Sequence, residues 1–101
     1  MKKGLVDLIV LSVVSRGGVS GVDLVFALDG VFTAGTIYPA LARMERAGFL
    51  EATKRTADTG RTRKEYDLSS LGQRELESLF DVWDSLSQAV RKFRTEAHHG
   101  A

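Results

Sequence analysis

The sequence predicts a mainly α-helical domain that carries one small β-hairpin and ends in a long helix. Two observations predict this fold class: helical apolar spacing in four segments and, before the last of them, two strand-like runs joined by a turn. A length of 101 residues suits a single domain. With 44% hydrophobic and 27% charged residues, the composition is that of a folded globule rather than a disordered chain.

The first predicted helix covers residues 5–15 and ends before Gly17 and Gly18. It is apolar on most sides, so we expect it to be largely buried. Asp7 and Ser12 interrupt the apolar run, which is also far shorter than the roughly 20 residues that a membrane span needs. No small-residue cleavage site follows it. We therefore expect no secretory leader, no membrane contact and a cytoplasmic protein.

The second predicted helix covers residues 22–28. Ser20 offers an N-cap oxygen, and Asp23, three residues later, is a weak capping-box partner. Asp29 and Gly30 are a turn signal that ends this helix. We expect a short, well-defined element between two longer helices.

The third predicted helix ends at Ala47, because Gly48 takes the usual C-terminal glycine position. Thr33 or Thr36 can cap its start. Pro39 would break a helix interior but is tolerated in the first turn, which favours Thr36 as the cap.

Two strand-like runs, residues 49–55 and 62–68, flank a loop that contains Asp58, Thr59 and Gly60. From Ser69 or Ser70 a long helix extends to about Arg94, and we expect residues 95–101 to form a disordered tail. Three helices followed by a two-stranded hairpin is the layout of a winged helix-turn-helix, in which the hairpin is the wing. We assign residues 1–68 to a winged helix-turn-helix DNA-binding domain and residues 69–94 to a C-terminal dimerisation helix.

The third predicted helix has one apolar face and one unusual outward face. Its apolar face carries Ile37, Ala40, Leu41 and Met44. The outward face carries small residues and an aromatic ring in place of the usual lysines and glutamates: Gly35, Tyr38, Pro39, Ala42 and Arg46, with Thr36 and Arg43 at its edge. A major groove accepts such a helix, whose N-terminal side chains contact base edges. The alternative is an ordinary amphipathic helix with an incidental tyrosine.

The net charge of +1 hides a basic middle of the chain. Residues 43–64 carry seven basic and three acidic side chains, whereas residues 65–90 carry one basic and six acidic. The cations at or just after the hairpin loop can reach DNA phosphates, or they can simply prevent strand-to-strand aggregation. Because the two features occur together, we expect double-stranded DNA as partner, bound by Thr36, Tyr38, Pro39, Arg43, Arg46, Arg61, Arg63 and Lys64.

The long helix carries a heptad seam, with apolar residues spaced alternately by three and four positions. This seam can pack on the domain's own core, but its regularity favours a partner surface. It is too short for an isolated coiled coil, so we expect the first helix to join a homodimer interface. The predicted interface residues are Leu5, Leu8, Leu76, Leu79, Trp83, Leu86, Val90 and Phe93.

The run Gly35-Thr36-Ile37-Tyr38-Pro39-Ala40-Leu41-Ala42-Arg43-Met44-Glu45-Arg46-Ala47-Gly48-Phe49-Leu50 closely resembles the recognition-helix segment of PadR-family regulators. Residues 63–69, with Gly72 after them, and the opening residues 4–11 are also similar. The resemblance implies a winged helix-turn-helix repressor that binds a palindromic operator as a homodimer. The single C-terminal helix resembles the smaller subfamily, some of whose members respond to flat aromatic molecules at the dimer interface.

For such an aromatic effector, the resemblance implies a pocket with Trp83, Leu79 and Phe93 as walls. The two Trp83 rings of a dimer can instead close into a packed core, and both outcomes stay open at this point.

Other function classes fit the sequence less well. A winged helix that binds protein instead of DNA predicts an acidic or apolar wing, whereas this wing is basic. An enzyme is not expected, because the chain has no cysteine and its two histidines, His98 and His99, are adjacent near its end. No phosphate loop, nucleophile motif or metal-ligand spacing occurs, so we expect no metal and no cofactor.

Overall fold

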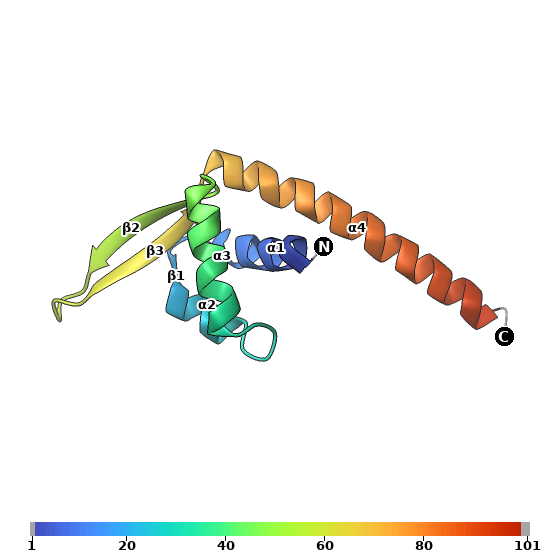
Figure 1. Cartoon of the computed structure of the whole chain (residues 1–101), viewed down its shortest axis with the longest axis horizontal. Helices are drawn as coiled ribbons and strands as arrows, with labels where there is room; N and C mark the ends of the chain where they lie inside the picture. Colours follow the sequence, from blue (N-terminus) through green and yellow to red (C-terminus); the bar gives the residue numbers. More distant parts are fainter. Residues whose placement is uncertain (1, 100–101) are drawn as a thin grey trace.

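The computed structural model describes residues 2–99 and confirms the predicted fold class. In chain order the elements are α1 (Lys2–Val14), β1 (Val19–Ser20), α2 (Gly21–Ala27), α3 (Ala34–Arg46), β2 (Leu50–Thr56), β3 (Thr62–Leu68) and α4 (Ser70–His99). The first three helices pack together, the β2–β3 hairpin projects to one side as the wing, and α4 extends away on the other side (Figure 1).

The core lies between α1, α2, α3 and the base of the wing. Its largest fully buried side chains are Val10, Leu11, Val14, Leu24, Ile37, Leu41 and Met44. Their helical spacing is the apolar pattern that predicts these three helices. Within the described residues no helix has both the length and the apolar character needed to cross a membrane.

The strand β1 is a feature that the sequence did not predict. It pairs antiparallel with β3, Val19 opposite Tyr66 and Ser20 opposite Glu65, and so turns the predicted hairpin into a three-stranded sheet of order β1-β3-β2. Gly17 and Gly18, both at positive φ, reverse the chain between α1 and β1. Two residues are too short for a visible alternation, which is why this strand left no signal in the sequence.

The capping box of α2 is confirmed. The Ser20 hydroxyl accepts from the amide of Asp23 at 3.1 Å, and the Asp23 carboxylate accepts from the amide of Ser20 at 3.0 Å. The helix spans Gly21–Ala27, one residue earlier than predicted. The backbone amides of Ser20 and Asp23, which have no partner within the helix, are thus hydrogen-bonded, and this fixes where α2 begins.

The predicted start of α3 is wrong. The helix begins at Ala34 with Thr33 as N-cap, whose carbonyl accepts from the amides of Thr36 and Ile37, both at 3.0 Å. Pro39 consequently lies inside the helix, where it removes the bond to the carbonyl of Gly35. Because Gly35 is exposed, water can satisfy that carbonyl, and the helix continues.

The end of α3 agrees with the prediction. Gly48 has a φ of +83°, its amide bonds to Glu45, and the amide of Phe49 bonds to the carbonyl of Met44 at 3.0 Å. This Schellman arrangement is the usual glycine-terminated helix end. The wing follows at once, with Leu50 opposite Leu68 and Thr56 opposite Thr62 at its two ends.

The last helix is longer than expected. The Ser69 hydroxyl accepts from the amide of Gly72 at 3.0 Å and so caps the start of α4. The helix then continues to His99, so the predicted end at Arg94 is wrong and residues 95–99, expected to be a disordered tail, are helical. The remaining part of that expected tail, residues 100–101, lies outside the described residues.

Candidate nucleic-acid interface

The solvent-facing side of α3 is a stripe of small residues. Ile37, Ala40, Leu41 and Met44 are buried, as predicted. The opposite side, Gly35, Pro39, Ala42 and Arg46, is exposed, and Thr36 is exposed at its edge. The short side chains of Pro39 and Ala42, with Gly35, let the helix backbone approach another surface closely, and Arg46 supplies a positive charge at the C-terminal end of the helix.

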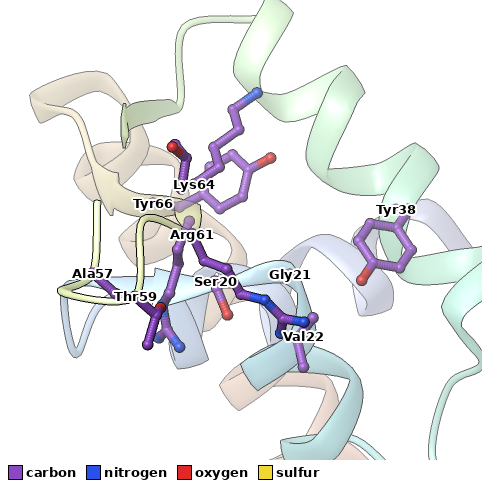
Figure 2. A pocket seen from close by; sticks show the side chains of 11 residues that line it. Ser20, Gly21, Val22, Tyr38, Ala57, Thr59, Arg61, Lys64 and Tyr66 are labelled. Carbon is purple, nitrogen blue, oxygen red and sulfur yellow. The ribbon is translucent and has the colours of Figure 1, made fainter. Parts of the chain in front are cut away.

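Tyr38 lies on the flank of α3 that faces the wing. Its ring rests against Gly21, the first residue of α2: a Cβ atom at Gly21 would lie 2.6 Å from Cε1 of Tyr38. The side chain remains 46% exposed. Figure 2 shows Tyr38 across the hollow from Lys64 and Tyr66 of the wing. The absence of a side chain at Gly21 therefore makes room for the Tyr38 ring, which stays accessible to solvent.

A groove of about 570 Å³ separates the wing from the starts of α2 and α3. Its walls include three of the predicted DNA contacts from the wing, Arg61, Arg63 and Lys64, together with Tyr38 from α3 (Figure 2). A second hollow of about 410 Å³, on the other flank of α3, contains Thr36, Pro39, Arg43 and Arg46. The fold thus gathers the eight predicted DNA-binding residues on two neighbouring surfaces that share α3.

The register of the wing sets like charges directly opposite each other. Lys54 on β2 pairs with Lys64 on β3, and Arg55 pairs with Arg63. Opposed like charges destabilise a sheet, so this arrangement costs stability unless anions compensate it. Lys54 and Arg55 were not among the predicted contacts, because only the cations at or just after the hairpin loop were considered and no strand register was predicted.

Two neighbouring carboxylates partly neutralise Arg63. The guanidinium of Arg63 pairs with Asp23 of α2, and its Nε lies 3.0 Å from Glu65. The hydrogen bond from the backbone of Ser20, and then the Ser20 hydroxyl and Arg63, lower the pKa of Asp23 below its usual 3.8. Arg63 therefore joins the wing to the start of α2.

Lys64 makes the corresponding link to α3. Its ammonium lies 2.9 Å from the carboxylate of Glu45, and that hydrogen bond raises the pKa of Lys64 above 10.5. The same ammonium lies 5.4 Å from the centre of the Tyr66 ring. Among the described residues, Arg46 and Arg61 have no ion pair, so they are the predicted cations most available to a phosphate.

Arg43 is also engaged within the protein. Its guanidinium donates to both oxygens of Asp7 on α1, at 2.7 and 3.0 Å. The side chain of Arg43 is 35% exposed and that of Asp7 is 11% exposed. A residue expected to contact DNA is therefore held by a bidentate ion pair to another helix.

A second surface, formed by α1 and α4, is apolar. Of the predicted interface residues, Leu8 is buried, while Leu76 and Leu79 are partly buried against the domain's own core. The other predicted interface residues are exposed: Leu5, Trp83, Leu86, Val90 and Phe93. Phe80 and Val82, which the sequence analysis did not include, are each 55% exposed beside this seam.

Trp83 lies between two hollows on this apolar surface. One, of about 280 Å³, contains Leu5, Leu8 and Leu79. The other, of about 330 Å³, contains Phe80 and residues of α1. Two of the three predicted pocket residues, Trp83 and Leu79, are thus brought together, whereas Phe93 lies farther along α4 and lines neither hollow.

Comparisons with known proteins give a consistent result. Residues 10–78 match the transcriptional regulator PadR-like family. A search of curated proteins found no match.

Solved structures similar to the whole chain include two bacterial regulators. A PadR-like transcriptional regulator from Bacillus cereus has a TM-score of 0.81 at 29% identity, with 92% of this chain and 94% of that chain covered. A Streptococcus transcriptional regulator has a TM-score of 0.80 at 28% identity, with coverage of 91% and 94%. Bacillus subtilis PadR in complex with operator DNA shares the fold, with a TM-score of 0.68 at 24% identity over 75% of this chain and 46% of that one.

Proposed function

This chain belongs to the transcriptional regulator PadR-like family, and from that premise we propose that it represses transcription by binding a palindromic operator as a homodimer. A family of transcriptional regulators is not one of enzymes, so the prediction that this protein is not an enzyme is confirmed. The observation that carries the proposal is the wing, whose cations Arg61, Arg63 and Lys64 line a groove that Tyr38 of α3 also lines.

The charge arrangement supports a polyanionic partner. Three of the four opposed cations have carboxylate partners, Arg55 and Arg63 with Glu65 and Lys64 with Glu45. A phosphate backbone beside the wing would add an anion for Lys54, which has no ion pair among the described residues, and would replace carboxylates at the others. Arg61 at the wing tip and Arg46 at the end of α3 would bind phosphates, while Arg63 and Lys64 would exchange carboxylates for phosphates. These contacts supply affinity and orientation rather than sequence preference.

Sequence preference is assigned to the N-terminal half of α3. In a winged helix-turn-helix the third helix enters the major groove, and its first side chains contact base edges. Thr36 and Tyr38 have hydroxyl groups that can donate to or accept from bases. The exposed Pro39 and Ala42 leave room for the helix to approach the groove floor.

The exposed apolar surface supports the homodimer. Leu5 of α1 and Trp83, Leu86, Val90 and Phe93 of α4 are exposed, and the four residues of α4 repeat at helical spacing, so a monomer would leave this apolar face in water. A second copy related by a two-fold axis would cover it with the same face. In this proposal residues 1–68 bind DNA, α4 pairs the subunits, and the two-fold symmetry of the dimer requires a palindromic operator.

Repression and its relief are the finer parts of the proposal. Bacillus subtilis PadR, which shares this fold, was crystallised with operator DNA. A dimer bound to such an operator at a promoter would exclude RNA polymerase. A flat aromatic effector that occupies the hollows beside Trp83 would relieve repression only if it bound the DNA-competent arrangement of the two wings less well than another arrangement.

Selection from random-sequence duplexes tests this function. The purified protein should enrich an inverted repeat whose half-sites lie about one helical turn, roughly 10 base pairs, apart. A single unrepeated motif would contradict the dimeric arrangement on DNA. Recovery of no common motif would contradict sequence-specific binding altogether.

A further inference from the structure

We propose that Arg43 does not contact DNA but acts with Asp7 as a strut that fixes the position of α3 on α1, which makes Asp7 a determinant of operator preference. The inference rests on the proposed DNA-binding function and assigns a role within it. Arg43 was expected to be a DNA contact because it lies at the edge of the outward face of α3.

The geometry of the pair favours a structural role. Both guanidinium nitrogens Nη1 and Nη2 donate to the two carboxylate oxygens of Asp7, at 3.0 and 2.7 Å. This bidentate arrangement restricts rotation as well as distance, unlike a lysine contact. The hydrogen bond to Asp7 also raises the pKa of Arg43, so the guanidinium stays charged.

Asp7 depends on this partner. It is 8% exposed and lies on the face of α1 that packs into the core with Val10, Leu11 and Val14. Arg43 is its only ion-pair partner among the described residues. If a phosphate recruited Arg43, a nearly buried carboxylate would lose its counter-charge, which is an unfavourable exchange.

The strut acts on one flank of α3, and a second ion pair acts on the other. Arg43 joins α3 to α1, while Glu45 joins it to Lys64 of the wing at 2.9 Å. The opposite face of α1 carries Leu5, part of the apolar surface proposed to pair the subunits. The Asp7–Arg43 pair therefore connects the helix assigned to base contacts with a helix of the dimer face.

The two roles for Arg43 predict opposite effects of Asp7→Asn. If Arg43 contacted phosphate, neutralising Asp7 would release a cation and remove a nearby negative charge, so binding to every duplex would become tighter. If the pair is a strut, the same substitution loosens α3 and lowers affinity for the operator but not for unrelated DNA.

The test uses the duplex that the wild-type protein enriches most and a scrambled duplex of the same composition. We expect Asp7→Asn and Arg43→Gln each to weaken binding to the enriched duplex by roughly tenfold and to leave the scrambled duplex unchanged. The double variant should lose no more than either single variant, because the two side chains form one interaction. Arg43→Lys, which keeps the charge but loses the bidentate geometry, should also lose preference and covers the case in which Arg43→Gln does not fold.

The salt dependence separates a strut from a phosphate contact. The slope of log affinity against log salt is negative, and for Arg43→Gln it should equal that of the wild type. Arg46→Gln, the matched control on the same helix, should reduce the magnitude of this slope by about one, as expected for one lost phosphate contact. A pair that only stabilised the fold would lower the melting temperature and leave the preference of the folded protein intact, so melting curves are recorded for each variant.

Three results would overturn the proposal. They are tighter binding of both duplexes by Asp7→Asn, a lowered salt slope for Arg43→Gln, and full preference retained by Arg43→Lys. If the wild type and Asp7→Asn prefer the enriched duplex to the same degree, the strut is refuted but the proposed function is not. A wild-type protein without any preference would refute the proposed function as well.

Discussion

Gly72 of α4 lies directly against the backbone of Phe49, where a Cβ atom would be 2.0 Å from the carbonyl oxygen of Phe49. The same carbonyl accepts from the amide of Ser69 at 3.1 Å, and the Ser69 hydroxyl caps α4. The helix that carries the apolar seam therefore starts in close contact with the segment that joins α3 to the wing. A side chain at position 72 would therefore meet the backbone of this segment.

Gly72→Ala is the first prediction that follows from this contact. The new methyl group cannot be accommodated by a side-chain movement because backbone atoms meet it, so we expect a loss of about 1–3 kcal/mol in the free energy of unfolding. Denaturant unfolding measures it. Gly35→Ala is the control, since the nearest atom to its Cβ is 3.7 Å away, and it should be neutral or stabilising. Equal stability of both variants would show that α4 does not approach Phe49 so closely.

Acid should weaken the junction between α2 and the wing. Because the folded protein lowers the pKa of Asp23 below 3.8, the unfolded chain binds its proton more readily than the folded one. The stability that Asp23 contributes is therefore fully present above the unfolded pKa of 3.8. It is lost as the pH falls below this value and through the lower pKa of the folded state. We expect the free energy of unfolding to fall less between pH 5 and pH 3 in Asp23→Asn than in the wild type. An equal fall in the two proteins over this pH range would contradict the prediction.

The dimer prediction concerns Trp83. Light scattering should give a mass near twice 11.0 kDa for the wild type, and Trp83→Asp should shift it toward the monomer because a charge would be buried at the interface. Phe26→Asp provides a matched control: Phe26 is 77% exposed but belongs to α2. A wild-type monomer at micromolar concentration, or equal dissociation by the two variants, would contradict the proposed interface.

The hollows beside Trp83 lead to a ligand prediction. Trp83 is the only tryptophan, so its fluorescence reports on this surface. Titration with the planar dye proflavine, without DNA, should quench it at micromolar concentration, and Leu5→Ala should weaken the effect. Phe93→Ala, outside both hollows, should not. Absence of quenching would favour a closed apolar core, and quenching without a parallel loss of operator affinity would contradict the effector role.

The predictions that succeeded from sequence are those governed by local chemistry. The capping box of Ser20 and Asp23, the helix end at Gly48 and the strand Thr62–Leu68 each depend on residues close together in the chain. The start of α3 failed because the preference for proline in a first turn is weaker than the packing that holds Ala34–Arg46 helical. Packing of this kind is not encoded in any short segment.

The interactions that organise the candidate site were less accessible. Asp7 and Arg43 are 36 residues apart, and the ring of Tyr38 rests on Gly21 of another helix. One signal was available: a carboxylate in a buried apolar helix requires a cation, which should have directed attention from Asp7 to an arginine on a neighbouring helix. Asp7 was instead interpreted only as a polar residue that excludes a membrane span.

The assignment of roles within the interface predicts a division between two kinds of variant. Thr36→Ala and Tyr38→Ala should lose discrimination between the enriched and scrambled duplexes, because the proposal assigns base-edge contacts to these side chains. Arg61→Ala should weaken binding to both duplexes about equally and reduce the magnitude of the salt slope by about one. Loss of preference in Arg61→Ala with full preference in Tyr38→Ala would reverse the assignment.

The most direct test of sequence-specific DNA binding is the ratio of the wild-type dissociation constants for the scrambled and the enriched duplex. Equilibrium titration at about 0.15 M salt keeps the electrostatic contribution at a physiological level. We expect a ratio of roughly 10³ or more, as for specific DNA-binding proteins. A ratio near one, with both duplexes bound equally, would contradict it.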